Sequence, residues 1–209
     1  MKGLFLAALT LLASVSCSAG GGSKQTDEET VTNNTTDMKE KGKALVIFFS
    51  HAGENYSVGH IEVGNTKIVA DYISEMTGAD QFEIVAEKSY DMPYSQLIKL
   101  AQEEERKGEL PAYKGQVPDL AQYDTIFIGG PIWWGTYPRV MFTFFGENDL
   151  NGKTIIPFTT HEGSGLGNVV SDVKNAYPNA TITGQFSIAG HNVRSGKATV
   201  QRWLNGLGY

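Results

Sequence analysis

Short apolar runs that alternate with segments of helical periodicity constrain this chain of 209 residues more than any other feature. The clearest run, residues 45–49, reads Leu-Val-Ile-Phe-Phe without a polar break, which is typical of a parallel strand covered on both faces. The predicted strands occupy residues 45–49, 81–85, 125–128, 154–159 and 182–188. Parallel strands need helical crossovers on the faces of the sheet. The alternation therefore predicts an α/β fold: a doubly wound, five-stranded parallel sheet with helices on both faces.

Between these strands, apolar residues recur at the spacing of one helix face. The predicted helices lie near residues 65–76, 94–107, 138–145, 166–176 and 200–207. Pro138 suits the first turn of its helix, where the missing backbone N–H costs nothing. The run Glu103-Glu104-Glu105 predicts a solvated face on the 94–107 helix.

The first residues of the chain resemble an export signal. Lys2 supplies a basic start, residues 4–12 are apolar, and small residues lead to Cys17, the only cysteine. We expect Cys17 to be the lipidated first residue of a bacterial lipoprotein, held at the membrane by this anchor alone, in the periplasm or at the cell surface. The alternative is a plain secretory signal and a secreted protein. A signal peptide (1–17) would precede a flexible polar linker (18–43) and one folded domain (44–209).

The charge balance excludes some classes of partner. The formal net charge is -6 and the pI is near 5.2, whereas nucleic acids and anionic membrane surfaces attract clusters of Lys and Arg. We therefore expect no nucleic-acid partner. His161 and Glu162 are adjacent, but no spacing in the chain supplies the three or four ligands of a metal site, so we interpret them as polar loop residues.

Three loops follow the predicted strands at the edge where such a sheet binds ligands. They carry glycine, hydroxyl or aromatic residues, and they comprise residues 50–53 with 64–66, residues 130–137, and residues 160–167. Gly64-Asn65-Thr66 opens a helix, and the free N–H groups of a helix N-terminus bind phosphate. Taken alone, the same three residues are also compatible with an ordinary helix cap.

The order of these loops, with Ser50 and Gly64-Asn65-Thr66 in the phosphate loop, resembles the flavodoxin family over residues 43–209. The resemblance implies the strand order 2-1-3-4-5 and a non-covalent FMN. It places the phosphate in the first loop, the flavin ring beside the second and the pyrimidine edge of the ring at the third. His51 would donate a hydrogen bond to the phosphate or face solvent. The predicted cofactor-binding residues are Ser50, His51, Ala52, Asn65, Thr66, Lys67, Pro131, Ile132, Trp133, Trp134, Gly135, Thr136, Thr160, His161, Gly163 and Gly165.

The second loop contains two adjacent indoles and a glycine. Trp133 and Trp134 cannot easily point the same way, so we expect one to cover the flavin and the other to pack beneath it. Gly135 tolerates a positive φ, which would let the backbone approach the flavin. In the family, rotation of a peptide at this place accompanies one-electron reduction.

Two features depart from the family pattern. Residues 54–63 interrupt the phosphate loop, and they would form a flap over the site or displace Ser50 from Asn65 and Thr66. The third loop lacks the aromatic residue that many flavodoxins stack on the outer face of the flavin. His161, Leu166 or Tyr56 could take that place.

Two functions of different classes follow. The first is an electron carrier or small flavin oxidoreductase, including a pyridine-nucleotide-dependent quinone or flavin reductase, in which FMN passes electrons to a protein or small molecule that the sequence does not identify. The second is an exported, tethered binding module whose flavodoxin fold no longer does redox work, because fold alone does not establish function.

Overall fold

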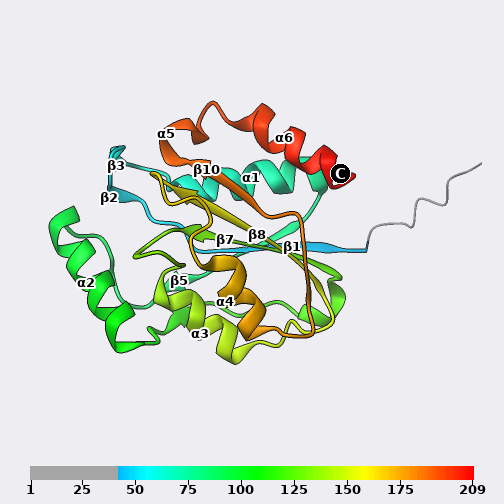
Figure 1. The fold of residues 1–209 in the computed structure, drawn as a ribbon, viewed down its shortest axis with the longest axis horizontal. Helices are drawn as coiled ribbons and strands as arrows, with labels where there is room; N and C mark the ends of the chain where they lie inside the picture. The colour runs from blue at the N-terminus through cyan, green and yellow to red at the C-terminus, as the bar shows by residue number, and fades with distance from the viewer. Residues whose placement is uncertain (1–41) are drawn as a thin grey trace, which may run out of the picture. The chain divides into compact units, whose positions relative to one another are not determined.

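A parallel sheet forms the centre of the computed structural model, which describes residues 42–209 (Figure 1). The predicted signal peptide, Cys17 and most of the predicted linker lie outside these residues. The main strands are β1 (Ala44–Phe48), β4 (Asp80–Glu83), β7 (Thr125–Pro131), β8 (Thr154–His161) and β10 (Phe186–Ala189). Their order across the sheet is β10-β8-β7-β1-β4, and all the pairs are parallel. In chain order this is 2-1-3-4-5, which confirms the predicted doubly wound sheet.

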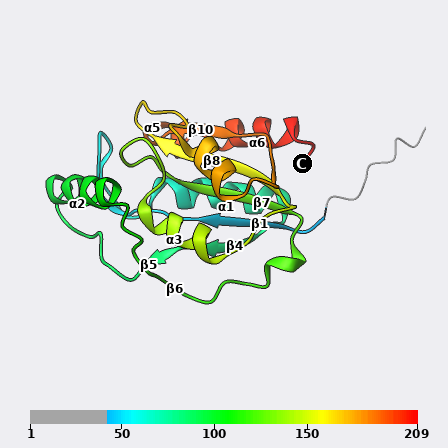
Figure 2. The ribbon, with the colours of Figure 1, turned by 60° about the horizontal axis from the view of Figure 1, so that its bottom comes forward.

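Helices cover both faces of the sheet, as Figures 1 and 2 show. On one face lie α1 (Asn65–Thr77), α5 (Gly190–Val193) and α6 (Lys197–Gly206). On the other lie α3 (Arg139–Glu147) and α4 (Val169–Ala176), and α2 (Tyr94–Lys107) adjoins their core layer from beyond the end of the strands. The bounds of α2 are those predicted from the sequence. Within residues 42–209, no helix has the length and apolar character needed to cross a membrane.

The fully buried β1 shows why its sequence carries no polar break. Leu45 and Ile47 belong to the core layer beneath α3 and α4, whereas Val46 and Phe48 belong to the layer beneath α1 and α6. Successive side chains of a strand point to opposite faces, so a strand covered on both sides needs apolar residues at every position.

The last predicted strand is divided into two pieces. Strand β9 (Thr181–Ile182) and strand β10 both pair with β8, and residues 183–185 separate them. Gly184 lies between the pieces with φ +61°, a left-handed conformation that breaks the extended backbone. A side chain at Gly184 would also overlap Leu207, since an added Cβ would lie 2.5 Å from Leu207 Cδ2.

One hairpin, a second two-stranded sheet and one short helix complete the described chain. The hairpin pairs β2 (Gly53–Asn55) with β3 (Gly59–Ile61), within the insert that divides the predicted phosphate loop. The second small sheet pairs β5 (Val85–Ala86) with β6 (Tyr113–Lys114), which precede and follow α2 in the sequence and run antiparallel. A 3-10 turn, η1 (Leu120–Gln122), precedes β7.

The acidic run on α2 is only partly solvated, which corrects the sequence-based expectation. Glu104 is 1% exposed, and its carboxylate accepts hydrogen bonds from Lys88 Nζ at 2.6 Å and from the Tyr90 hydroxyl at 3.0 Å. Both donors come from the segment before α2, so the run itself contains no sign of them. Buried carboxylates persist in folded proteins where such partners satisfy them.

Replacement of this buried carboxylate should destabilise the fold. We expect Glu104→Gln to lower the free energy of unfolding by about 1–3 kcal/mol, because one buried donor loses its charged acceptor. The matched variant Glu103→Gln, on the same helix but paired with Lys107 at the surface, should leave it nearly unchanged, because water screens an exposed ion pair. Urea unfolding measures both values. Equal losses in the two variants would contradict the structural role of Glu104.

Candidate functional site

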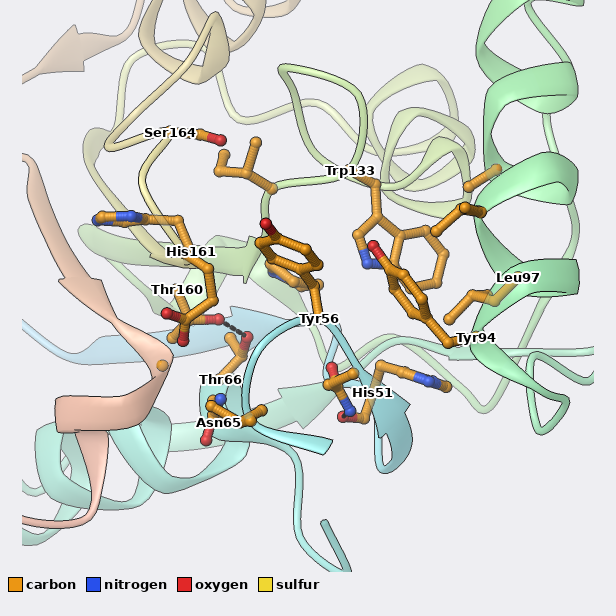
Figure 3. Close-up of a pocket in the computed structure, with 18 of the residues that line it drawn as sticks. His51, Tyr56, Asn65, Thr66, Tyr94, Leu97, Trp133, Thr160, His161 and Ser164 are labelled. Carbon is orange, nitrogen blue, oxygen red and sulfur yellow. Dashed lines mark hydrogen bonds between the residues drawn. The ribbon is translucent and has the colours of Figure 1, made fainter. Parts of the chain in front are cut away.

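A cavity of about 350 Å³ opens at the carboxyl ends of β1, β7 and β8 (Figure 3). Its volume lies in the range of small-molecule sites. The predicted residues that line it are His51, Asn65, Thr66, Pro131, Ile132, Trp133, Trp134, Thr160 and His161. The predicted residues outside its lining are Ser50, Ala52, Lys67, Gly135, Thr136, Gly163 and Gly165.

The two halves of the divided loop meet despite the insert. The backbone N–H of Lys67, in the first turn of α1, donates to Ser50 Oγ at 2.9 Å. An added Cβ on Gly64 would lie 2.2 Å from Ser50 Oγ and 2.7 Å from the His51 carbonyl oxygen. Gly64 therefore permits the close approach of the two segments. The insert does not displace Ser50 from the start of α1.

Neither Lys67 nor Ala52 presents its side chain to the cavity. The Lys67 ammonium donates to Asp71 one turn further along α1, at 2.5 Å. Ala52 is exposed to solvent. Ser50 contributes by positioning the backbone of α1.

A buried hydroxyl pair connects α1 with β8 at the inner end of the cavity. Thr66 Oγ1 and Thr160 Oγ1 are 2.8 Å apart, and both residues are almost fully buried. Asn65 lies beside them at the first position of α1, as Figure 3 shows. This end of the cavity is therefore lined with hydroxyl and amide groups at a helix N-terminus.

The adjacent indoles point in different directions. Trp133 packs edge-on against Tyr90 at 5.1 Å, Phe49 at 5.6 Å and His51 at 5.7 Å between ring centroids. Trp134 is 51% exposed, and its indole N–H donates to the Ile98 carbonyl of α2 at 2.9 Å. Trp133 thus belongs to a cluster of packed rings, Phe49, His51, Tyr90 and Trp133, that we call the aromatic floor of the cavity. Trp134 instead connects the second loop to α2.

A tight turn sets these two directions. Trp133 N–H donates to the Thr136 carbonyl at 2.8 Å, and Trp134 and Gly135 between them have φ +52° and +90°. Positive φ at both central positions is the pattern of a type I′ turn, in which glycine is favoured and an indole residue is rare. The Gly135 carbonyl in turn accepts the Asn168 N–H at 2.7 Å, and a Cβ at Gly167 would lie 2.2 Å from the Gly135 oxygen.

The insert supplies a wall of the cavity that sequence reasoning left as one of two alternatives. The β2–β3 hairpin places Tyr56 over the cavity (Figure 3), 63% exposed and with its ring 6.1 Å from that of Tyr94. Among His161, Leu166 and Tyr56, the three candidates for the outer face of the flavin, Tyr56 therefore brings a phenol ring to the lining of the cavity. Leu166 is absent from the lining.

Helix α2 forms a further wall that the sequence did not indicate. The lining residues outside the predicted set of cofactor contacts are Glu54, Asn55, Tyr56, Val58, Tyr94, Leu97, Ile98, Ala101, Glu162, Ser164 and Gly190, and of these Tyr56 was a candidate for the outer face of the flavin. The apolar stripe of α2 predicted only that the helix packs against something. Glu162 and Ser164 lie on the third loop, which the sequence indicated at the site, and Glu54, Asn55 and Val58 lie on the insert, for which a flap over the site was one of two alternatives.

Two histidines at the cavity have pKa values below their usual value of 6.5. Burial lowers the pKa of His51, although a hydrogen bond to the Glu54 carbonyl (3.3 Å from Nε2) and the charge of Asp91 oppose this. Burial also lowers the pKa of His161, with Glu162 opposing and His191 adding to the effect. The Gly163 N–H donates to His161 Nδ1 at 2.9 Å, so neutral His161 carries its proton on Nε2.

The cavity is poor in cationic groups. Its lining, drawn from residues 42–209, contains no lysine or arginine, and its carboxylates are Glu54 and Glu162. No group of three or more His, Cys, Asp or Glu side chains within the described residues is arranged to hold a metal ion. An anion bound here would depend on backbone and neutral side-chain donors.

Comparison with known proteins gives a consistent picture. The family model described as flavodoxin matches residues 43–207. A putative flavoprotein from Bacteroides uniformis ATCC 8492 is 29% identical with a TM-score of 0.65, over 79% of this chain and 99% of that chain. A putative flavoprotein from Bacteroides eggerthii DSM 20697 is 27% identical with a TM-score of 0.63, over 81% and 99%.

A more distant structure shares the fold alone. The flavoprotein from Lactobacillus acidophilus NCFM, solved in complex with FMN, is 20% identical with a TM-score of 0.55, over 74% of this chain and 97% of that chain. No curated protein matches this chain.

The close approach at Gly64 can be tested by adding a methyl group. Gly64→Ala should lower the free energy of unfolding by about 1–3 kcal/mol, because the new Cβ overlaps a backbone carbonyl that cannot move freely. Gly146→Ala, in α3 and facing open space, should leave stability unchanged or raise it by up to about 1 kcal/mol. Urea denaturation of both variants measures the difference. Equal stability of the Gly64→Ala and Gly146→Ala proteins would contradict the close approach of the two loop segments at Gly64.

Burial of His51 predicts a pH dependence. Because its folded-state pKa lies below 6.5, the unfolded chain binds the proton more readily, and stability should fall as the pH drops from above 6.5 toward the folded pKa. His51→Asn should show a shallower fall over this range. His60→Asn, whose native side chain is 56% exposed, serves as the matched control. Identical pH profiles for His51→Asn and the unchanged protein, from urea unfolding, would refute this origin.

Proposed function

The chain belongs to the flavodoxin family, since the family model spans residues 43–207, and from this premise we propose that it binds FMN and transfers electrons. The observation that carries the proposal is the position of the cavity. It opens between the carboxyl ends of β1 and β7, where the strand order reverses. In doubly wound sheets this switch point is where ligands bind, and flavodoxins hold FMN there.

The inner end of the cavity has the donors that a phosphate requires. Helix α1 begins there with no acidic residue in its first turn, so its N–H groups and its dipole favour an anion. Asn65, Thr66 and Thr160 add amide and hydroxyl groups to the lining. This donor set fits the phosphate of FMN without a lysine or arginine.

The outer part of the cavity suits a broad, mainly apolar ring. Trp133, Tyr56 and Tyr94 contribute aromatic surface, and Leu97 and Ile98 contribute aliphatic surface from α2. Flat heteroaromatic ligands favour such walls, with a few polar groups to serve their edges. The residues present therefore fit both ends of FMN.

Bound FMN would supply one-electron and two-electron redox chemistry. The residues of this chain would hold and shield it: the start of α1 fixes one end, and the aromatic floor and hairpin limit access of water to the ring. The redox role, as an electron carrier or as a small flavin oxidoreductase acting with a protein or small-molecule partner, belongs to this proposal.

The location that we propose is the periplasm or the surface of a bacterial cell, with the domain held at a membrane by a lipid. The support is the sequence of the first residues, in which an apolar stretch and small residues precede Cys17. A lipid on Cys17 would tether the domain through the polar segment that follows. Labelling with a radioactive fatty acid, lost in Cys17→Ser, tests the anchor.

Titration with FMN tests the binding. Addition of FMN to the purified chain should give a yellow complex at micromolar concentration, with altered flavin fluorescence. The double variant Asn65→Ala/Thr66→Val should weaken FMN at least about tenfold while changing riboflavin by less than about twofold, because only FMN carries the phosphate. Thr77→Val, at the other end of α1, is the matched control.

Two results would count against the proposal. If micromolar FMN gives no complex, the protein is better described as a binding module without a flavin. If the complex forms but stepwise addition of dithionite, followed by air, fails to bleach and restore the visible flavin band, the redox role is wrong although the binding is right.

A further inference from the structure

Glu162 brings a carboxylate to the place where α1 begins. Its side chain lines the cavity and is only 13% exposed. An added Cβ on Gly190 would lie 2.4 Å from Asn65 Nδ2 and 2.6 Å from Glu162 Oε1. These two atoms are therefore no more than about 5 Å apart, which is the sum of the two distances. The carboxylate is a direct neighbour of the group that we propose to bind the phosphate.

Two donors from one residue of α5 hold this carboxylate in place. The His191 backbone N–H donates to Glu162 Oε1 at 2.9 Å, and His191 Nδ1 lies 2.6 Å from Oε2. A carboxylate only accepts, so Nδ1 carries the proton in this contact. The absence of a side chain at Gly190 lets α5 lie against both Glu162 and Asn65.

A carboxylate at this position opposes the binding of a phosphate. A phosphate monoester carries about -1.5 to -2 charges near neutral pH. Like charges a few ångströms apart repel strongly where water is partly excluded, as it is around Glu162. Proton donation by His191 offsets part of the carboxylate charge. Riboflavin has the same ring and ribityl chain as FMN but no phosphate, so it would not experience this repulsion.

We propose that Glu162 and His191 together set how strongly the site prefers FMN over riboflavin, Glu162 reducing the preference and His191 restoring it. The inference rests on the proposed function, because it concerns the phosphate end of the same cavity. It assigns a specificity-determining role to two residues, Glu162 on the loop after β8 and His191 on α5, outside the predicted set of cofactor contacts.

The experiment compares two flavins on the full chain at fixed pH and low salt. Glu162→Gln keeps the shape of the side chain and removes its charge, so it should tighten FMN about tenfold and leave riboflavin within about twofold. His191→Phe keeps a ring but removes the donor, so it should weaken FMN several-fold, again with riboflavin unchanged. Flavin fluorescence titration measures all the dissociation constants.

Glu87→Gln is the matched control, because it removes one negative charge from an exposed residue outside the cavity lining. It should change neither flavin's affinity by more than about twofold, since water and salt screen an exposed charge outside the lining. Addition of salt should also shrink the gain in Glu162→Gln. Circular dichroism and thermal unfolding establish that each variant remains folded.

The outcomes separate this inference from the function beneath it. Binding of neither flavin by the unchanged protein would overturn the proposed function, and this inference with it. If FMN binds, but Glu162→Gln shifts FMN and riboflavin by the same factor, the carboxylate acts on the shared part of the molecule and the inference is wrong. Opposite shifts of FMN affinity in Glu162→Gln and His191→Phe, with riboflavin constant, would support it.

Discussion

The arrangement of the cavity depends on the hydrogen bond from the Lys67 N–H to Ser50 Oγ. It fixes the start of α1 against the end of β1, although the hairpin and its flanking residues intervene in sequence. Gly64 makes the bond possible by leaving room for Ser50 and His51. Because this contact closes the base of the insert, β2 and β3 can form a wall of the cavity instead of separating the two halves of the loop.

The walls of the cavity come from elements that only the sheet brings together. The Thr66–Thr160 contact joins α1 to β8, and the Trp134–Ile98 contact joins the second loop to α2. The result is a polar end at a helix N-terminus and an aromatic remainder. Since the lining has no lysine or arginine, helix and amide dipoles are the main attraction for an anion, and a single nearby carboxylate has a large influence.

Local patterns predicted the frame of the molecule and the position of its site. The parallel sheet, the bounds of α2 and the convergence of three loops followed from apolar periodicity and topology, whereas the strand order followed from the resemblance to the flavodoxin family. The partners of individual polar side chains did not. Glu104 appeared solvated and Lys67 appeared available to a phosphate, yet each has a partner that periodicity does not reveal. The α2 wall was missed for the same reason, because an amphipathic stripe does not say which neighbour it faces.

The hydrogen bond between the Gly135 carbonyl and the Asn168 N–H limits how these loops can be exchanged between related proteins. It joins the loop after β7 to the start of α4, and Gly167 is confined by the same carbonyl oxygen. The two loops therefore form one structural unit, although about 30 residues lie between them in the sequence. A graft that transfers either loop alone to a related scaffold would leave an unmatched carbonyl or a steric overlap, whereas transfer of both would carry the contact intact.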